Sequence, residues 1–131
     1  MTDYVKISGI KIPTVLAITQ DEQERGLMYQ KWPPPVMTFV YASPRINKFW
    51  MKNTLCPLDI VFCHKNKIIS ICSGEPYSTR LIGENQFSDL VVEFPAGTCK
   101  AYEVKVGDQI ELECSENSLM KIFMLKNGFH I

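Results

Sequence analysis

L-D-I-V-F-C-H-K-N-K-I-I-S-I-C-S, residues 58–73, contains two apolar runs separated by a short polar segment. Each run has the length of a strand, and Lys65 and Asn66 stand between them as in a two-residue β-hairpin. Apolar residues on both faces of each arm are typical of strands that are covered on both sides. We therefore expect residues 58–64 and 67–73 to form a hairpin in the middle of a β protein.

The other apolar segments are also short and alternate with period two, which is the pattern of antiparallel strands. In residues 48–52, Phe49 and Met51 share one face, while Lys48, Trp50 and Lys52 share the other. Further strands are expected at residues 12–19, 90–94 and 109–114. The sequence predicts a mostly β protein, a single compact antiparallel β-sandwich or barrel-like domain with two short helices.

The first of these helices is expected after Thr19. Either Thr19 with Glu22 or Asp21 with Glu24 has the spacing of a capping box, and Gly26 stands near the helix end. The second is expected at residues 98–103, with Thr98 as its cap. Pro33, Pro34 and Pro35 predict an extended surface connection. For the tail, residues 119–125, a strand is favoured over a short helix.

Length and composition limit the function. The 131 residues suit a single domain, and 46% hydrophobic and 21% charged residues are ordinary for a globular chain. We expect one domain over 1–131, with a core at about 12–114 and an extra strand or tail at 115–131. The 14 basic residues equal the 14 acidic ones, which argues against a broadly basic nucleic-acid binder.

The five cysteines fit neither a disulfide framework nor a zinc ribbon, because their number is odd and no C-x-x-C pair is present. Cys63, His64 and Cys72 do not predict a metal site either, since neighbours on a strand point to opposite faces. We see no signal peptide and no apolar run long enough to cross a membrane. These features predict a soluble cytoplasmic protein without disulfides, metal or membrane association.

The balanced charge hides a local separation. Seven basic and two acidic residues lie between positions 31 and 80, whereas two basic and eight acidic residues lie between 81 and 116. Opposite charges on neighbouring strands would explain this separation, and so would a modest basic face for an anionic ligand.

The segment F-W-M-K-N-T-L-C-P-L-D-I-V-F, residues 49–62, combines an indole with several polar groups. Trp50 and Lys52 are expected on one face, with Asn53 and Thr54 at its end. Asp59 precedes an apolar run and therefore needs a partner, since buried charges are nearly always paired. Lys52 and Arg25 are candidates for an ion pair, and amides of a turn are the alternative.

This segment and four others resemble the uncharacterised family known as domain of unknown function 192. The others are E-R-G-L-M (24–28), S-G-E-P-Y-S (73–78), V-V-E-F-P-A-G (91–97) and K-V-G-D-Q-I-E-L (105–112). The resemblance covers about residues 12–114 and implies a compact, mostly β domain, but it implies no activity. The positions that match the family's polar motif are Arg25, Lys52, Asn53, Thr54, Asp59 and Glu75.

The chain departs from the family pattern in three places. Prolines precede Met37 and Phe39 where a glycine is usual, the turn H-K-N-K lacks its usual glycine, and the signal that often precedes the domain is absent. An export role therefore does not transfer to this chain.

Three functional hypotheses follow from these residues. The first is a binding module for a small polar or anionic ligand, sugar-like or peptide-like, without a cofactor. Its expected ligand-binding residues are Arg25, Trp50, Lys52, Asn53, Thr54, Asp59 and Glu75. The second is a structural or protein-interaction domain, either a monomer or a weak homodimer. The third, less favoured, is a hydrolase-type enzyme that uses Asp59 and Glu75, or Cys56 as a nucleophile.

Overall fold

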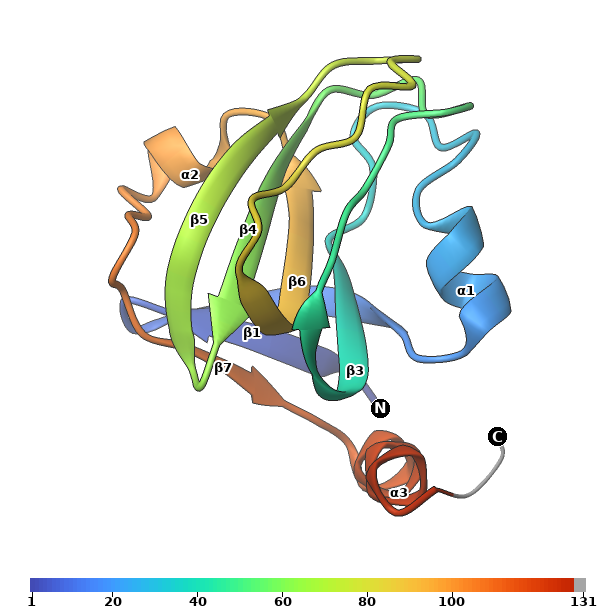
Figure 1. The fold of residues 1–131 in the computed structure, drawn as a ribbon. Coiled ribbons are helices and arrows are strands. Elements are labelled where there is room, and N and C mark those ends of the chain that lie inside the picture. The colour runs from blue at the N-terminus through green and yellow to red at the C-terminus, as the bar shows by residue number, and fades with distance from the viewer. Residues whose placement is uncertain (129–131) are drawn as a thin grey trace.

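The computed structural model describes residues 1–128, which fold into a curled, half-barrel sheet with short helices around it (Figure 1). Strands make up 42% of the chain and helices 16%, which confirms the mostly β fold. In chain order the elements are β1 (Asp3–Ile7), β2 (Ile10–Ala17), α1 (Gln20–Arg25), β3 (Met37–Ile46), β4 (Leu58–His64), β5 (Lys67–Gly74), β6 (Phe87–Pro95), α2 (Thr98–Ala101), β7 (Ile110–Glu113) and α3 (Glu116–Lys126).

The strands form one sheet in the order β5-β4-β6-β3-β2-β1-β7. Neighbours are antiparallel except β2 and β3, which run parallel because the connection through α1 returns the chain to the same end of the sheet. The sheet curls until its two ends approach each other. Lys67, at the start of β5, forms a bridge with Gln109, and the Ile110 amide donates to the Asn66 carbonyl at 3.0 Å.

The predicted hairpin is confirmed in β4 and β5, with Asp59 opposite Ser73 and His64 opposite Lys67. Both turn residues, Lys65 and Asn66, have positive φ angles, as a tight two-residue turn requires. The prediction of a central position holds for β4 but is wrong for β5, which ends the sheet. Apolar side chains on both faces indicate that a strand is covered above and below, but they do not show whether it has a hydrogen-bonded neighbour on each side. An edge strand of a curled sheet can therefore be apolar on both faces.

Two hydrophobic clusters cover the two faces of the central strands. One contains Phe39, Met51 and Ile60 and lies on the side of α1. The other contains Val61 and Phe94 and lies on the side of α2, β1 and β7. Ile60 and Val61 are neighbours on β4 and enter different clusters, which explains why β4 is apolar at nearly every position.

Residues 48–52 do not form a strand, although the expected alternation of inward-facing and exposed side chains is present. Phe49 makes a single bridge with Ile82, and the Met51 amide donates to the Ser78 carbonyl at 2.8 Å. Met51 is fully buried and Phe49 packs against the same cluster. Lys48, Trp50 and Lys52 are exposed.

The capping box at Thr19 is present in α1. Thr19 Oγ1 accepts from the Glu22 amide at 3.2 Å, while Glu22 Oε1 accepts from the Thr19 amide at 2.9 Å. The helix ends at Gly26, as its glycine indicated. In α2 the expected cap was misplaced by one residue: Gly97 is the N-cap, and Thr98 begins the helix with its hydroxyl bonded to the Pro95 carbonyl.

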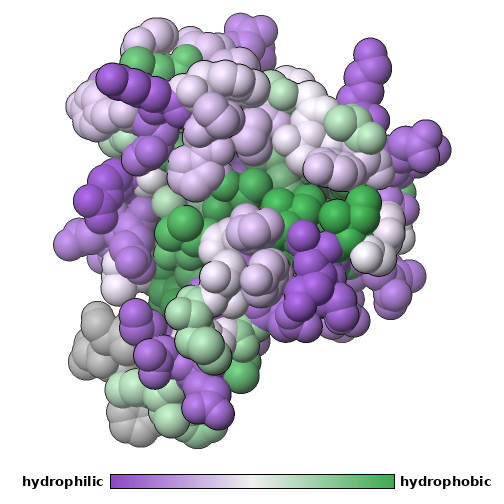
Figure 2. Space-filling view, turned by 180° about the vertical axis from the view of Figure 1, so that it is seen from behind, coloured by the Kyte–Doolittle hydropathy of each residue, from purple (hydrophilic) through white to green (hydrophobic). Residues whose placement is uncertain are grey.

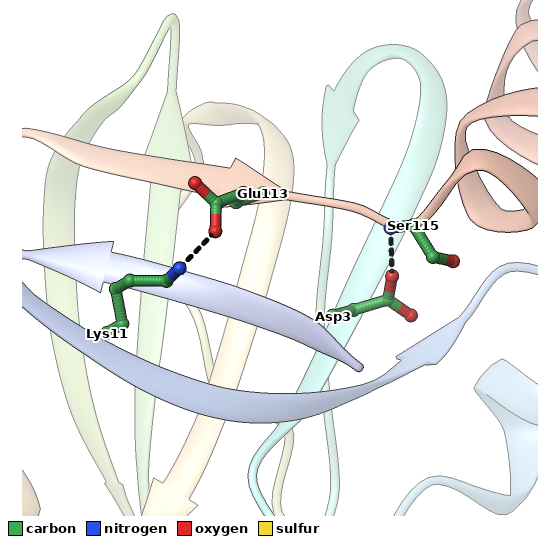
Figure 3. Close-up of polar contacts among 4 residues, drawn as sticks. All are labelled: Asp3, Lys11, Glu113 and Ser115. Carbon is green, nitrogen blue, oxygen red and sulfur yellow. Dashed lines mark hydrogen bonds and ion pairs between the residues drawn. The ribbon is translucent and has the colours of Figure 1, made fainter. Parts of the chain in front are cut away.

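The prediction of a strand for the tail was wrong, because residues 116–126 form α3. Ser115 caps the helix by accepting from the Ser118 amide, and Asp3 Oδ1 in turn accepts from the Ser115 amide at 2.8 Å (Figure 3). Just before this point, the exposed Lys11–Glu113 ion pair, 2.6 Å, links β2 to the end of β7, which pairs with β1. Apolar residues in 119–125 occur at both odd and even positions, a pattern that suits a helix as well as a strand. Only the N-cap at Ser115 distinguishes the two. Positions 129–131 of the predicted tail lie outside the described residues.

Candidate functional site

An open cavity of about 860 Å³ lies between α1, β3, β6 and the segment that follows β3. Its apolar walls are formed by Leu27, Phe39, Phe49 and neighbouring residues. The polar and charged groups that line it are Gln20, Gln23, Glu24, Arg25, Tyr41, Arg45, Asn47, Lys48, Trp50, Thr54 and Glu93. The volume falls within the range of sites for small molecules.

Glu93 is the buried carboxyl group of this cavity. It is 4% exposed and lies on the face of β6 that carries Val91, opposite Met37 of β3 and Ile60 of β4. Gly26 approaches it so closely that a Cβ there would lie 3.8 Å from Glu93 Oε1. Burial raises the pKa of Glu93 to about 8, since the charged form loses its hydration. The side chain is therefore mainly a neutral acid at pH 7.

Tyr41 and Arg45, both on β3, line the same cavity as Glu93. The Arg45 guanidinium lies over the Tyr41 ring, 4.6 Å from its centroid. Burial raises the pKa of Tyr41, with the guanidinium opposing the shift and the Glu93 carboxyl adding to it. Along β3, Tyr41 therefore stands between Met37, which lies opposite Glu93, and Arg45, whose guanidinium it contacts.

The Arg45 side chain is held in place by Asn47. Arg45 Nε donates to Asn47 Oδ1 at 2.8 Å, and Asn47 Nδ2 donates to Ser88 Oγ at 2.7 Å. Asn47 is buried, so this chain of bonds anchors the guanidinium to β6.

The cationic groups of the cavity form no ion pair with an acidic residue. Among residues 1–128 the salt bridge is the Lys11–Glu113 pair, which lies outside the cavity. Arg25 lies in the last turn of α1, and Lys48 Nζ donates to the Gly83 carbonyl at 2.6 Å. Arg25, Arg45 and Lys48 therefore keep their charge available to an anion at the cavity.

Three of the seven residues expected at the site line this cavity: Arg25, Trp50 and Thr54. Trp50 is 45% exposed, and the Lys52 ammonium lies 5.1 Å from its ring centroid, so Lys52 stands beside the rim. Thr54 is buried, and its hydroxyl bonds to the Lys52 carbonyl at 3.1 Å.

The remaining three do not line the cavity. Asn53 has a positive φ, and its carbonyl accepts from the Tyr29 amide. Glu75 is exposed in the turn after β5. Asp59 Oδ2 accepts from the amides of Gly97 and Cys99, at 3.1 and 3.0 Å. The turn-amide partner weighed for Asp59 is thus observed, and the ion pair with Lys52 or Arg25 is not formed.

Sequence reasoning did not select Glu93, Tyr41 or Arg45 as site residues. A signal for Glu93 was present, because it is a carboxylate inside the apolar run of residues 90–94, which is the argument that was applied to Asp59. Nothing in the sequence indicated Tyr41 and Arg45, because they line the same cavity as Glu93 only through the pairing of β3 with β6.

The described part of the chain has no group of three His, Cys, Asp or Glu residues placed to hold a metal ion. None of its helices has the length and apolarity to cross a membrane. All five cysteines are free, and burial raises the pKa of Cys99 to about 12.

A second, smaller hollow of about 450 Å³ lies at Lys31, Trp32, Leu55, Cys56 and Pro57. It is mostly apolar, and Cys56 Sγ bonds to the Gln30 carbonyl at 3.2 Å.

Figure 2 shows hydrophobic residues in a band across the face turned away from the view of Figure 1, with further pale green atoms on α3 below it. Leu119, Met120 and Phe123 of α3 are exposed.

The fold and cavity define a small curled-sheet protein with a polar pocket beneath its first helix. The family model described as DUF192, uncharacterized ACR, COG1430, matches residues 4–112, and the chain belongs to this family. No curated protein matches the chain.

Two solved structures share the fold. One is a protein of unknown function from Novosphingobium aromaticivorans, 28% identical, with a TM-score of 0.72, covering 84% of this chain and 83% of that one. The other is a "putative transcription regulator" from Sinorhizobium meliloti, 31% identical, with a TM-score of 0.75, covering 83% of this chain and 90% of that one.

Proposed function

We propose that the protein is a binding module for a small polar or anionic ligand, and that the ligand occupies the cavity beneath α1. The observation that supports this proposal most is the set of three cationic side chains, Arg25, Arg45 and Lys48, that border the cavity without an acidic partner within residues 1–128. Cations placed around a partly apolar cavity attract and orient an anion.

The aromatic wall supports the same role. Trp50 at the rim and Phe49 inside offer flat apolar surfaces to a ring or an aliphatic chain. Lys52 beside Trp50 adds a fourth positive charge at the entrance. Of the expected residues, Arg25, Trp50, Thr54 and Lys52 belong to this proposed site. Asp59 holds α2, and we assign Asn53 and Glu75 no contact with the ligand.

Binding is favoured over hydrolysis because the carboxylates proposed for catalysis lie elsewhere. Asp59 Oδ2 is occupied by two backbone amides, and neither Asp59 nor Glu75 lines the cavity. The five free cysteines support a reducing compartment, and a cytoplasmic location is part of this proposal.

The test is a thermal-shift and calorimetric screen with small carboxylates, sugar phosphates, sugars and amino acids. At least one class is expected to bind, with an affinity that falls about tenfold or more in Arg25→Ala or Trp50→Ala. Arg80→Ala is the matched control, because Arg80 is an exposed arginine that does not line the cavity. Binding that is insensitive to Arg25 and Trp50, or no binding in the whole panel, would contradict the proposal.

A further inference from the structure

We infer that the ligand is a small zwitterion, such as an amino acid, whose ammonium group pairs with Glu93 and whose anionic group pairs with Arg45. This inference rests on the proposed function and specifies the class of ligand. It starts from the positions of three cavity residues along β3 and β6: Glu93 lies opposite the start of β3, Arg45 lies near the end of β3, and Tyr41 stands between these positions.

The separation of the two ends follows from the strand register. Glu93 lies opposite Met37 near the start of β3, whereas Arg45 lies opposite Ser88 near its end. The two backbone positions are about 17 Å apart along β6 at the usual rise of a strand. The Arg45 side chain turns back over Tyr41, which shortens the gap between the charged groups. A short molecule with two oppositely charged ends fits this arrangement.

Within residues 1–128, the Glu93 carboxyl group forms no hydrogen bond or ion pair with another side chain. It is 4% exposed and lines the cavity, and the end of α1 nearest to Oε1 is Gly26, which has no side chain to offer as a partner. A buried polar group without a partner loses its hydration and gains no hydrogen bond in return, and the cost is larger for a charged group. A ligand that supplies a hydrogen-bonding cation removes this cost.

The surroundings explain why the partner comes from outside the chain. Tyr41 and Arg45 on β3, Glu24 and Arg25 on α1, and Lys48 are the other titratable or charged groups around the cavity. On β4, the residue opposite Glu93 is the apolar Ile60. Burial raises the pKa of Glu93 to about 8, and no neighbouring cation lowers it. Within residues 1–128, neither Arg45 nor Arg25 forms an ion pair with Glu93.

Pairing with an ammonium ion has a proton balance that can be measured. In the free protein at pH 7, Glu93 is mainly protonated. When the ammonium group binds, the carboxyl group ionises, its proton passes to the buffer, and the ammonium keeps its own protons. Binding near pH 7 should release close to one proton. A hydroxyl group at the same place would bond to the neutral acid without releasing a proton.

The experiment compares matched ligand pairs by titration calorimetry in buffers of different ionisation enthalpy. The pairs are alanine and lactate, phenylalanine and 3-phenyllactate, 4-aminobutyrate and 4-hydroxybutyrate, and 6-aminohexanoate and 6-hydroxyhexanoate. We expect at least one amino acid to bind about tenfold or more tightly than its hydroxy acid, with heats that depend on the buffer. In Glu93→Gln both the preference and the buffer dependence should disappear, whereas the exposed control Glu84→Gln should keep them.

The outcomes separate this inference from the proposed function. Hydroxy acids that bind as tightly as amino acids, or amino acids that bind without proton release, would overturn the zwitterion while leaving an Arg25-dependent anion site intact. An unchanged preference in Glu93→Gln would also overturn the inference. If no member of the pairs and no other anion binds, both proposals fail.

Discussion

Asp59 and Cys99, 40 residues apart in the chain, are joined by a hydrogen bond of 3.0 Å from the Cys99 amide to Asp59 Oδ2. The same oxygen accepts from the Gly97 amide at 3.1 Å. The N-cap of α2 is Gly97, so the helix has no side-chain cap of its own. The Asp59 carboxylate on β4 takes that role by accepting from two amides at the start of α2. Asp59 thus connects the hairpin to the α2 side of the sheet.

Replacing Asp59 by alanine should lower the free energy of unfolding by about 2 kcal/mol, because hydrogen bonds to a charged acceptor are worth about 1.5–3 kcal/mol. Urea denaturation measures this loss, with Asp21→Ala on exposed α1 as the control. Ligand affinity at the cavity should remain unchanged. Normal stability together with lost affinity would show that Asp59 binds ligand instead.

Gly26→Ala should destabilise the protein by about 1–3 kcal/mol through its backbone. Gly26 has φ +49° and ψ −128°, a conformation that residues with a Cβ rarely adopt. Space is not the obstacle, since the nearest atom to an added Cβ would be Phe39 Cζ at 3.5 Å. Denaturation of Gly26→Ala beside Glu24→Ala, an exposed position on the same helix, measures the effect. Equal stability of the two variants would contradict the strained conformation.

Glu93 should make the protein less stable as the pH rises from about 4.5 to about 8. Its folded pKa, about 8, is raised above the ordinary value of 4.5, so the folded state binds more protons than the unfolded state throughout this window. The stabilising contribution is complete below the lower pKa and is lost as the pH passes the upper one. Over the window the loss is on the order of 4 kcal/mol.

The measurement is urea denaturation of the wild type and Glu93→Gln at several values of pH between 4.5 and 8.5. Since glutamine remains neutral, the stability of the variant relative to the wild type should increase with pH. The exposed Glu84→Gln should not show this increase. A constant difference between wild type and Glu93→Gln would mean that Glu93 titrates normally.

Ser115→Ala should loosen α3. The substitution removes the acceptor for the Ser118 amide and costs about 1 kcal/mol, the usual value for an N-cap. Hydrogen exchange should accelerate in residues 116–126 but not in β4 or β6. Ser43→Ala, at an exposed position of β3, serves as the control. Exchange that is unchanged by Ser115→Ala would contradict the capped helix.

Local chemistry made part of this fold predictable. The alternation of Phe49 and Met51, the two-residue turn at Lys65 and Asn66, and the Thr19–Glu22 capping box each depend on residues close together in sequence, and each is present. The family resemblance, carried by short motifs such as residues 49–62, is likewise confirmed, since the family model matches residues 4–112.

The features that sequence reasoning missed depend on distant contacts. The cap of α3 is completed by Asp3, more than 110 residues away, so the local pattern at residues 119–125 could not separate helix from strand. Glu93 lines a cavity whose other walls come from α1 and β3, which are distant from it in the sequence. Asp59 and Glu93 are both carboxylates in apolar strands, and the sequence alone does not reveal that one meets backbone amides and the other an open space.

The central claim, that the cavity beneath α1 binds ligand, is tested most directly by amide chemical-shift mapping with the whole panel of small carboxylates, sugar phosphates, sugars and amino acids. The account predicts that shifts concentrate in residues 20–28, 39–50 and 91–93, and that they vanish in Arg25→Ala. Shifts concentrated at Trp32 and Leu55 around the second hollow, or none at all up to millimolar ligand, would contradict it.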